Sequence, residues 1–270
     1  MTATGLIGLS FVGAACGGST QTSNPAQSPE RQSDAEYDIA RDLLAKGQPR
    51  VALDHALKAV EFNEDNPKAL FLTSAIYAAF CNQDAGLASP DCKVPKAEEY
   101  ARKAMKADPR FREARNLLTQ ILIWEKKYDE AVSTIEPLTK DPAYVEAHLA
   151  WGNLGWAYVL GNKLDAGIEA LKNAVALQPR FCVGQYRLGA AYEKKNDLNQ
   201  AEQSYSRAVE VDAPECKNLQ DAWEARGRVR ARLGRVEEAR ADFGRCKEVA
   251  GDTKLGRACT VALTKLESPK

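Results

Sequence analysis

The chain has 270 residues, with 37 basic side chains, 37 acidic side chains and two histidines. This length allows one large domain or two small ones. The balanced charge argues against a nucleic-acid partner, or a polybasic membrane surface, as the main theme of the protein. Alanine and leucine are frequent, and glycine and proline are scarce within the periodic part of the chain, so the sequence predicts an all-helical protein.

The N-terminal residues form an apolar segment that ends at a cysteine. The apolar run from Gly5 to Ala15 is too short to cross a bilayer as a helix but suits the core of a signal peptide, and Cys16 follows it directly. This order resembles a bacterial lipoprotein cleavage site, and the resemblance implies a signal peptide over residues 1–15 and acyl chains on Cys16. Gly13, in place of a branched aliphatic residue, and the lack of Lys or Arg before the run depart from the pattern. A disordered apolar N-terminus is the alternative interpretation.

The residues after Cys16 predict how the protein is anchored. Residue 17 is glycine rather than aspartate, and in the sorting pattern that the site resembles this sends a lipoprotein to the outer membrane. We therefore expect a lipid anchor on the periplasmic face of the outer membrane. Residues 16–32 are polar with no apolar period, which predicts a flexible tether with a reach of roughly 20–25 Å.

Helix–turn–helix units are predicted from residue 33 onwards by the spacing of apolar residues. The first unit covers residues 33–66, with Ile39 on its first helix. The second begins at Pro67 and carries an insertion between its two helices. The third begins near Arg112, and Pro137 falls where its second helix should continue, which predicts a shortened or kinked helix.

The fourth unit, residues 148–181, carries the clearest pattern. Trp151, Leu154 and Tyr158 recur at helical spacing and form one apolar face of its first helix. Small residues follow where the two helices must approach closely, namely Gly155, Gly167 and Ala174. This order and spacing match the 34-residue pattern of the tetratricopeptide repeat (TPR), in which a single unit cannot bury its own apolar face and needs neighbours.

Two further units complete the array. The fifth covers residues 182–215 and the sixth begins near Gln220. A last amphipathic segment, residues 255–266, has the character of the capping helix that such arrays need. The sequence therefore predicts an all-α TPR superhelix, an α-solenoid of six repeats with a C-terminal capping helix, over residues 33–266.

Six cysteines remain if Cys16 is acylated, and an even number fits an oxidising compartment in which disulfides persist. Many pairings are possible, but the spacing along the chain favours three local ones. These are Cys81–Cys92, Cys182–Cys216 and Cys246–Cys259. The second pair occupies equivalent positions of successive repeats, too far apart for a disulfide unless the extra residues around Cys216 bend the chain back.

The sequence predicts no catalytic site, metal site or cofactor. His55 and His148 are far apart in the repeat register and are interpreted as surface or packing residues. The insertion with Cys81 and Cys92 has neither CxxC spacing nor a histidine, so it is interpreted as a stapled turn. An enzyme that uses a cysteine of this insertion is the alternative from another class.

Partner binding is expected in the concave groove that the first helix of each repeat lines. The positions that face inward carry large apolar residues beyond those that the repeat signature needs for packing, and such a patch typically marks a partner site. They are Phe71, Ile123, Trp124, Leu149, Trp156, Val159, Leu160, Val183 and Tyr186. The alternative is that tight superhelix curvature buries Trp124 and Trp156, with Leu160 and Tyr186 left at the rim.

The sixth repeat is rich in arginine. Arg226 and Arg230 fall at positions that are normally apolar, so we expect this repeat to pack less well. Arg228 and Arg232 fall on the groove face. A solvated, ion-paired repeat explains these residues, because four acidic residues lie close in sequence, at positions Glu224, Glu237, Glu238 and Asp242. Contact with an anionic segment of a partner is the alternative.

A lipoprotein-type start, a short polar tether and six TPR units together resemble the pilotins of type IV pilus systems. The resemblance implies a non-enzymatic outer-membrane lipoprotein that binds the secretin subunit and promotes its localisation and its assembly into a ring. Its implied partners are the secretin and, through the acyl anchor, the inner leaflet of the outer membrane; nucleic acid is not among them. Another periplasmic TPR scaffold, for β-barrel assembly or for recruitment of peptidoglycan enzymes, is the alternative.

Overall fold

The computed structural model describes residues 28–81 and 90–267, and within these ranges it contains fourteen helices and no strand. The helices are α1 (Pro29–Ala45), α2 (Pro49–Phe62), α3 (Pro67–Cys81), α4 (Val94–Ala107), α5 (Arg112–Trp124), α6 (Tyr128–Thr139), α7 (Ala147–Leu160), α8 (Leu164–Leu177), α9 (Cys182–Lys194), α10 (Leu198–Glu210), α11 (Pro214–Lys217), α12 (Gln220–Arg232), α13 (Val236–Val249) and α14 (Lys254–Glu267).

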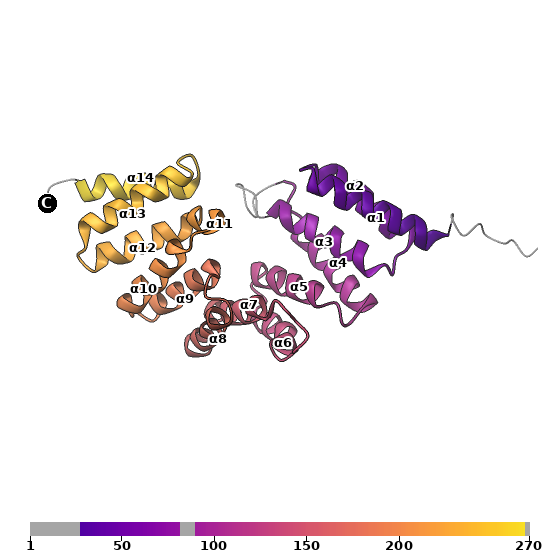
Figure 1. Ribbon diagram of the computed structural model, residues 1–270, viewed down its shortest axis with the longest axis horizontal. Helices are drawn as coiled ribbons and strands as arrows, with labels where there is room; N and C mark the ends of the chain where they lie inside the picture. The colour runs from indigo at the N-terminus through magenta and orange to yellow at the C-terminus, as the bar shows by residue number, and fades with distance from the viewer. Residues whose placement is uncertain (1–27, 82–89, 268–270) are drawn as a thin grey trace, which may run out of the picture.

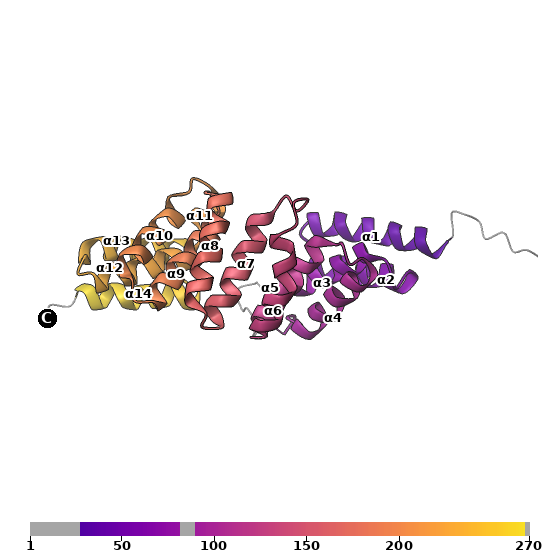
Figure 2. The same ribbon diagram turned by 90° about the horizontal axis from the view of Figure 1, so that it is seen from below.

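Successive helices pack as pairs, and the pairs follow one another to form an arch (Figure 1). Six pairs, from α1–α2 to α12–α13, are followed by α14, which packs against α13. In the middle of the arch α5, α7 and α9 lie on the inner side, and α6, α8 and α10 lie on the outer side (Figure 1). The view from below shows the pairs arranged along the long axis of the molecule (Figure 2). This arrangement confirms the predicted TPR superhelix of six repeats with a C-terminal capping helix.

Small residues set the distance between the two helices of a pair. In the fourth pair, a Cβ atom added to Gly155 would lie 2.9 Å from the carbonyl oxygen of Gly167 and 2.6 Å from the Leu171 side chain. Only glycine therefore lets α7 and α8 approach this closely. Ala174, further along α8, is fully buried. The small residues of the repeat signature thus allow the close helix contact that the sequence pattern predicts.

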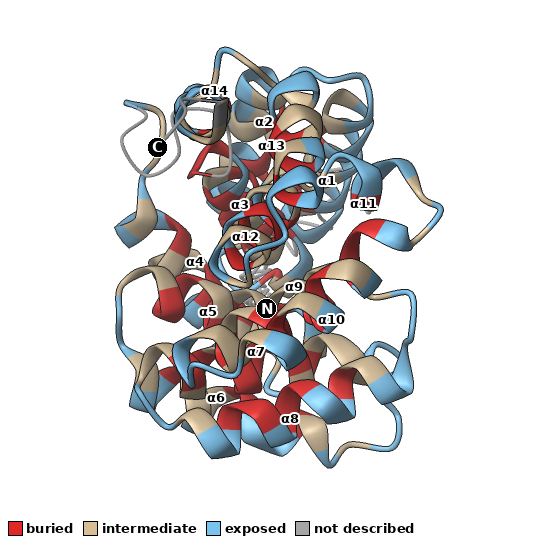
Figure 3. Ribbon diagram, turned by 90° about the vertical axis from the view of Figure 1, so that its left-hand side faces the viewer, coloured by how far each residue is buried: buried red, intermediate tan, exposed pale blue. Residues whose placement is uncertain are grey.

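The core is a series of small apolar clusters between neighbouring helices. Buried residues are concentrated on the sides where helices face each other, and exposed residues cover the outer faces (Figure 3). The largest fully buried apolar side chains include Ile76, Ile121 and Leu171, each in a different cluster. Each repeat therefore buries its apolar face mainly against its immediate neighbours, as expected for a solenoid.

The first helix begins earlier than predicted. It starts at Pro29, so its first turn belongs to the folded part of the chain rather than to the tether predicted over residues 16–32. Proline at this position is preset for a helix, and the Ser28 hydroxyl accepts a hydrogen bond from the backbone N–H of Arg31 at 3.4 Å. Ser33 is fully buried and donates to a carbonyl oxygen of α2, so the predicted domain start at residue 33 lies one turn inside the helix.

Ile39 lies on the first helix, as predicted, but it does not belong to the core. Its exposed fraction is 43%. Tyr37, Leu43 and Leu44 instead pack against the cluster that joins α1, α2 and α3. Because no described repeat precedes α1, the side of this helix that carries Ile39 has no neighbour to cover it.

The predicted disulfide Cys81–Cys92 is present and closes the insertion of the second repeat. Cys81 is the last residue of α3, and α4 begins at Val94, two residues after Cys92. The residues between, 82–89, lie outside the described ranges.

The third pair is irregular at Pro137, as predicted. This residue lies inside the last turn of α6, which has 12 residues where α8 of the next pair has 14. In the connection that follows, Tyr144 is buried against Ile135 and Leu138 of α6. The shortened helix is therefore covered by its own connecting segment.

The predicted disulfide Cys182–Cys216 is also present, and its Cα atoms are 5.7 Å apart. The short helix α11, at Pro214–Lys217, carries Cys216 back towards the start of α9. The extra residues between the fifth and sixth repeats thus bend the chain as the sequence analysis expected.

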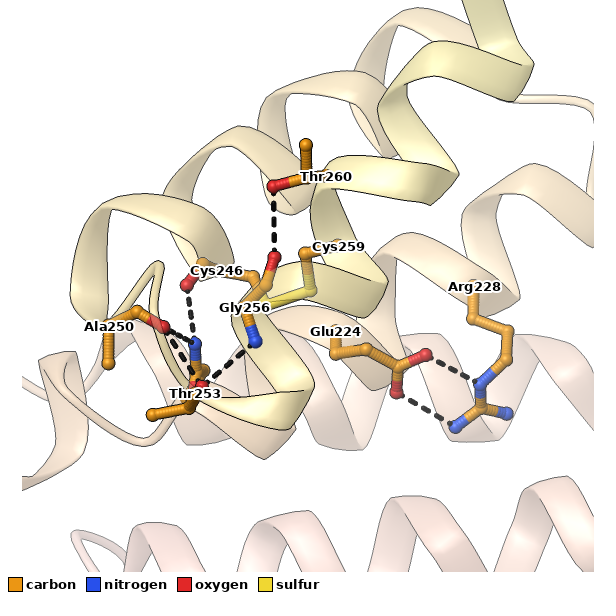
Figure 4. Close-up of a disulfide and its surroundings, with 9 residues drawn as sticks. Glu224, Arg228, Cys246, Ala250, Thr253, Gly256, Cys259 and Thr260 are labelled. Atoms are coloured by element: carbon orange, nitrogen blue, oxygen red, sulfur yellow. Dashed lines mark hydrogen bonds and ion pairs between the residues drawn. A yellow bond between two sulfur atoms is a disulfide. The ribbon is translucent and has the colours of Figure 1, made fainter. Parts of the chain in front are cut away.

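The capping helix is attached by the third predicted disulfide, Cys246–Cys259, and by a set of hydrogen bonds (Figure 4). The Gln220 side-chain amide donates to the carbonyl oxygens of Cys246 and Ala250, at 2.8 and 2.9 Å. A Cβ atom on Gly256 would collide with the Ala250 carbonyl oxygen, so the turn into α14 requires glycine there. Repeat six and the cap therefore form one cross-linked unit.

Among the described residues, no helix combines the length and the apolar character needed to cross a bilayer. The predicted signal peptide, the acylated Cys16 and residues 16–27 of the tether lie outside the described ranges.

Candidate partner-binding surface

The first helices of the repeats form the inner side of the arch, and we call the surface of α3, α5, α7, α9 and α12 the inner surface (Figure 1). It contains the residues that the sequence analysis placed in a groove. The structure divides these residues into a central patch, two flanks, a buried pair and the arginines of repeat six.

The centre of the inner surface is apolar. Trp124 at the end of α5, with Trp156 and Leu160 on α7, pack against one core cluster, and all three side chains remain partly exposed. We call these three residues the central apolar patch. The curvature of the superhelix covers part of each tryptophan, but it does not bury either ring completely.

Two predicted groove residues belong to the core instead. Val159 is fully buried and packs in a cluster with Ile168 and Leu188, and Ile123 is 6% exposed. The burial of Val159 has a local cause. This residue faces Gly167 of α8 so closely that a Cβ atom on the glycine would lie 2.6 Å from the valine side chain. Neither residue offers a surface to a partner, so their assignment to the groove is wrong.

The other predicted apolar residues flank the central apolar patch and are half-buried. Phe71 packs its ring against that of Phe111, with centroids 5.0 Å apart. The ring centroids of Tyr186 and Tyr205 are 5.8 Å apart, and burial raises the pKa of Tyr186 to about 12. Leu149 on α7 and Val183 on α9 are also partly exposed. The inner surface thus offers half-buried apolar side chains on α3, α5, α7 and α9.

The two groove-facing arginines of repeat six already bind a carboxylate within the chain. Arg228 and Arg232 on α12 both donate to Glu193 of α9, and Arg228 also pairs with Glu224 (Figure 4). Glu193 is only 11% exposed and accepts a third hydrogen bond from the Tyr205 hydroxyl at 2.9 Å. The sequence analysis missed Glu193 because it lies in the preceding repeat.

The other two arginines are ion-paired, as expected, but they are largely buried, which corrects the expectation of a solvated, poorly packed repeat. Arg226 is 7% exposed and makes two hydrogen bonds to Asp242, at 2.7 and 3.0 Å. Arg230 reaches the same carboxylate at 3.0 Å and also binds Glu202 of α10. These bonds are charge-assisted and pair the buried charges, so the arginines pack within the core of repeat six.

A row of polar side chains that the sequence analysis did not identify runs from α5 through α7 to α9. Asn116 and Asn153 are buried beneath the inner surface, and Arg187 is partly exposed. Asn153 of α7 donates from its amide to Asn116 of α5 at 2.9 Å, and its oxygen accepts a hydrogen bond from Arg187 of α9 at 2.9 Å. A signal was present in the sequence. Asn153 and Arg187 are 34 residues apart, at the same repeat position, and each interrupts an otherwise apolar or small-residue helix face.

Arg187 differs electrostatically from the arginines of repeat six. It forms no ion pair with any described residue, and its second protein acceptor is the carbonyl oxygen of Gly152 at 3.3 Å. Its guanidinium lies 5.8 Å from the centre of the Trp156 ring. Burial lowers the pKa of Arg187 to about 10, and the opposing charge effect comes from Tyr186 rather than from a carboxylate. The side chain is still cationic at neutral pH.

The histidines lie in separate parts of the fold. His148 packs edge-on against Phe181, with ring centroids 5.0 Å apart, and His55 pairs with Glu36. Within residues 28–81 and 90–267, no group of three or more His, Cys, Asp or Glu side chains is arranged to hold a metal ion.

Comparison with known sequences identifies the repeats. Residues 148–181 and 186–245 match models of the tetratricopeptide repeat. Heat shock protein STI1 of Saccharomyces cerevisiae is 33% identical over 90 residues, which are 33% of this chain and 15% of that protein. An Hsp70-Hsp90 organising protein of Plasmodium falciparum is 29% identical over 99 residues, or 36% of this chain and 38% of that protein. The chain therefore spans well under half of these curated relatives.

Comparison with solved structures extends the likeness to most of the chain. PilW, described as a widely conserved type IV pilus biogenesis factor, superposes with a TM-score of 0.68 at 17% identity, over 84% of this chain and 98% of PilW. PilF of Pseudomonas aeruginosa gives a TM-score of 0.64 at 17% identity, over 87% and 99% of the two chains. A tetratricopeptide repeat protein of Parabacteroides merdae gives 0.66 at 14% identity, over 92% and 87%. At these identities the likeness concerns the fold.

The fold and the inner surface define a TPR scaffold of the kind that binds other proteins. In its architecture, this scaffold resembles the pilus biogenesis factor PilW and the PilF protein of Pseudomonas aeruginosa.

Proposed function

We propose that this protein is a pilotin, an outer-membrane lipoprotein that binds the secretin subunit of a type IV pilus system and promotes its localisation and assembly into a ring. The observation that carries the proposal is the extent of the match to PilW. The superposition with this chain covers 98% of that pilus biogenesis factor, at a TM-score of 0.68. The curated relatives, in contrast, share only part of their length with this chain.

The N-terminal sequence supports the proposed location. The pattern before Cys16 resembles a lipoprotein cleavage site, and several acyl chains on one cysteine hold a protein stably in a membrane. The polar residues after Cys16 would then place the TPR domain at a short distance from the inner leaflet, on the periplasmic side. The three disulfides fit such an oxidising compartment.

The central apolar patch supports the proposed mode of binding. Trp124, Trp156 and Leu160 are held by the core on one side and remain accessible on the other. Large aromatic side chains held in this way are typical anchors of protein interfaces. In this proposal the inner surface holds an apolar segment of the secretin, as a strand or a helix, until that segment pairs within the assembled ring.

The proposal is tested by following SDS-resistant secretin multimers on a blot of cells that lack the gene. We expect the multimer to be lost while the monomer remains, and the wild-type gene to restore the multimer. Unchanged multimers in the deletion strain would contradict the pilotin proposal and would favour another periplasmic scaffold role.

The same strain tests the binding surface. The double variant Trp124→Ala/Trp156→Ala should fail to restore the multimer, because truncation of each anchor weakens an interface by about 2–4 kcal/mol. The matched control, Leu177→Ala/Val236→Ala, removes two exposed apolar side chains from α8 and α13 and should restore the multimer fully. Restoration by the tryptophan variant, when it is folded and present at wild-type level, would exclude the inner surface as the binding site.

A further inference from the structure

We propose that the outer side of repeat four binds an arginine of a protein partner, in a hollow between α6 and α8. This site is separate from the inner surface, and the inference goes beyond the proposed role as a pilotin. The observation that carries it is that the corresponding place in repeat six already holds a guanidinium of the chain itself, that of Arg226.

The hollow has a volume of about 420 Å³ and lies between α6 and α8, the outer helices of the third and fourth repeats (Figure 1). We call it the outer hollow. Much of its lining is apolar, with Trp151, Leu154 and Tyr158 from α7 and Ala170 from α8. Both aromatic side chains are partly exposed. The outer hollow therefore offers an accessible aromatic surface on the side of the arch opposite to the central apolar patch.

Repeat six shows which group fits this place. Trp223 takes the position of Trp151 in that repeat. Three residues later in each repeat, Arg226 stands where repeat four has Leu154. The guanidinium carbon of Arg226 lies 4.9 Å from the centre of the Trp223 ring, within the range of a cation–π interaction. A tryptophan at this repeat position can therefore hold a guanidinium.

The other contacts of Arg226 also correspond to residues of the outer hollow. Its guanidinium donates to Asp242 of α13, which stands at the position of Ala170. It also donates to the Ser206 hydroxyl at 3.2 Å. Ser206 and Glu136 are each the ninth residue of their helices, α10 and α6. The counterparts of all three Arg226 contacts line the outer hollow, so this guanidinium marks the place that a partner arginine would take in repeat four.

The rim of the outer hollow carries the charge that a guanidinium requires. Glu136, Asp165 and Glu169 contribute three carboxylates, against the single ammonium of Lys140. Glu136 pairs with Lys140, and Asp165 pairs with Lys195. Glu169 forms no ion pair with any described residue. Electrostatic complementarity therefore favours a cation, and Glu169 is available for a bidentate pair with an arginine.

Trp151 favours an arginine within a peptide over a small guanidino compound. Its indole N–H makes no hydrogen bond to a described residue, whereas that of Trp223 donates to the Lys217 carbonyl oxygen at 2.9 Å. No described Lys or Arg side chain lies over the Trp151 ring. A peptide that brings an arginine also brings backbone carbonyl groups, so it can bind both the ring and the indole N–H.

A peptide array tests this inference without the secretin. Each peptide is acetylated and amidated, so that its ends carry no charge, and it combines aliphatic and aromatic residues with one arginine. Matched copies carry lysine in its place, or citrulline, which keeps the shape of arginine but not its charge. The full-length protein is applied as wild type, Glu169→Gln, Trp151→Leu and Glu210→Gln. The last variant removes an equal charge from an exposed position on α10.

A further variant fills the outer hollow from within. Leu154→Arg/Ala170→Asp gives repeat four the two residues that form the buried ion pair of repeat six. Its own guanidinium should then occupy the outer hollow and exclude a partner arginine. Circular dichroism and thermal unfolding of each variant show whether it is folded.

We expect wild type to bind arginine peptides about tenfold more strongly than their citrulline copies. The lysine copies should bind at an intermediate level, because lysine keeps the charge but not the planar guanidinium. Glu169→Gln and Trp151→Leu should each reduce the arginine preference about threefold or more. Leu154→Arg/Ala170→Asp should abolish the preference, and Glu210→Gln should retain all of it.

Two results would overturn the inference: no preference for arginine over citrulline in wild type, or an undiminished preference in folded Glu169→Gln and folded Leu154→Arg/Ala170→Asp. Because the array contains no secretin, either result leaves the pilotin proposal to be decided by the multimer blot. Conversely, an arginine preference that depends on Glu169 and Trp151 would support this inference even if the deletion strain assembles its secretin normally.

Discussion

Repeats four and six are built from equivalent helix pairs, but the side chains packed between the two helices differ in character. In repeat four, Leu154 of α7 packs in one cluster with Ala170 of α8. The residues at the same two positions in repeat six are Arg226 and Asp242, which form a buried ion pair. Leu154 and Arg226 are almost equally buried, at 4% and 7% exposure. The TPR backbone therefore accepts a charged pair in place of an apolar one when both partners are supplied.

The comparison also separates structural charge from charge available to a partner. The arginines of α12 in repeat six pair with Asp242 of the same repeat and with Glu193 of repeat five, and a disulfide fixes the cap to α13. In repeats three to five, the inner surface instead presents half-buried tryptophans, and Arg187 has no carboxylate partner among the described residues. We infer that repeat six stabilises the end of the solenoid, whereas repeats three to five bind the partner.

The largest expected effect comes from breaking the charged core. Asp242→Ala removes a carboxylate that is 2% exposed and leaves Arg226 and Arg230 without their shared partner. Loss of one side of a buried ion pair costs about 3–5 kcal/mol of unfolding free energy. Chemical denaturation of the purified domain measures this loss.

The double variant Arg226→Leu/Asp242→Ala gives repeat six the residues of repeat four and serves as the matched control. It should recover much of the loss, because an apolar pair can replace a buried ion pair at little cost. A double variant as unstable as Asp242→Ala alone would contradict the view that the two cores are interchangeable.

A smaller effect is expected from the link between repeat six and the cap. Cys246→Ser with Cys259→Ser opens a loop with a sequence separation of 13 residues. In the chain-entropy model this lowers the unfolding free energy by about 3 kcal/mol. Hydrogen exchange should show the loss of protection concentrated in α13 and α14, with repeats three and four unchanged. A uniform loss of protection throughout the domain would contradict this expectation, because the disulfide would then not stabilise the cap alone.

The smallest expected effect comes from Gly155 and Gly227, the glycines at the contact between the two helices of repeats four and six. Gly155→Ala would place a Cβ atom 2.6 Å from Leu171 and 2.9 Å from backbone atoms of α8, whereas Gly227→Ala would place one 3.1 Å from the Phe243 side chain. Overpacking costs about 1–3 kcal/mol, with the larger value expected where backbone must move. Thermal unfolding should therefore rank Gly155→Ala below Gly227→Ala in stability, and the reverse order would contradict the packing described for repeat four.

Much of the fold could be predicted because the determinants lie within one repeat. The spacing of Trp151, Gly155 and Tyr158 predicts a helix and the face that it packs. The cysteine pairs could be predicted from local spacing, and Cys182–Cys216 from the extra residues that bend the chain. The start of α1 could not be predicted, because its N-cap Ser28 and its first residue Pro29 lie in a stretch that has the composition of a tether.

The site could be predicted less well because it depends on contacts between repeats. Counting positions places Val159 on the groove, but close packing of α7 against α8 and α9 buries it completely. Glu193 and Arg187 act on residues 34 to 39 positions away in a neighbouring repeat. Counting along the repeats shows which residues occupy equivalent positions, but it does not show which of them contact each other.

The central claim, that the inner surface binds the secretin, is tested most directly by site-specific photo-crosslinking in living cells. The photoreactive residue p-benzoylphenylalanine would replace Leu160 in the central apolar patch or, as a control, Leu177, which is 57% exposed on the outer helix α8. We predict a crosslink to the secretin subunit from position 160 and none from position 177. A crosslink from position 177 without one from position 160 would contradict the account.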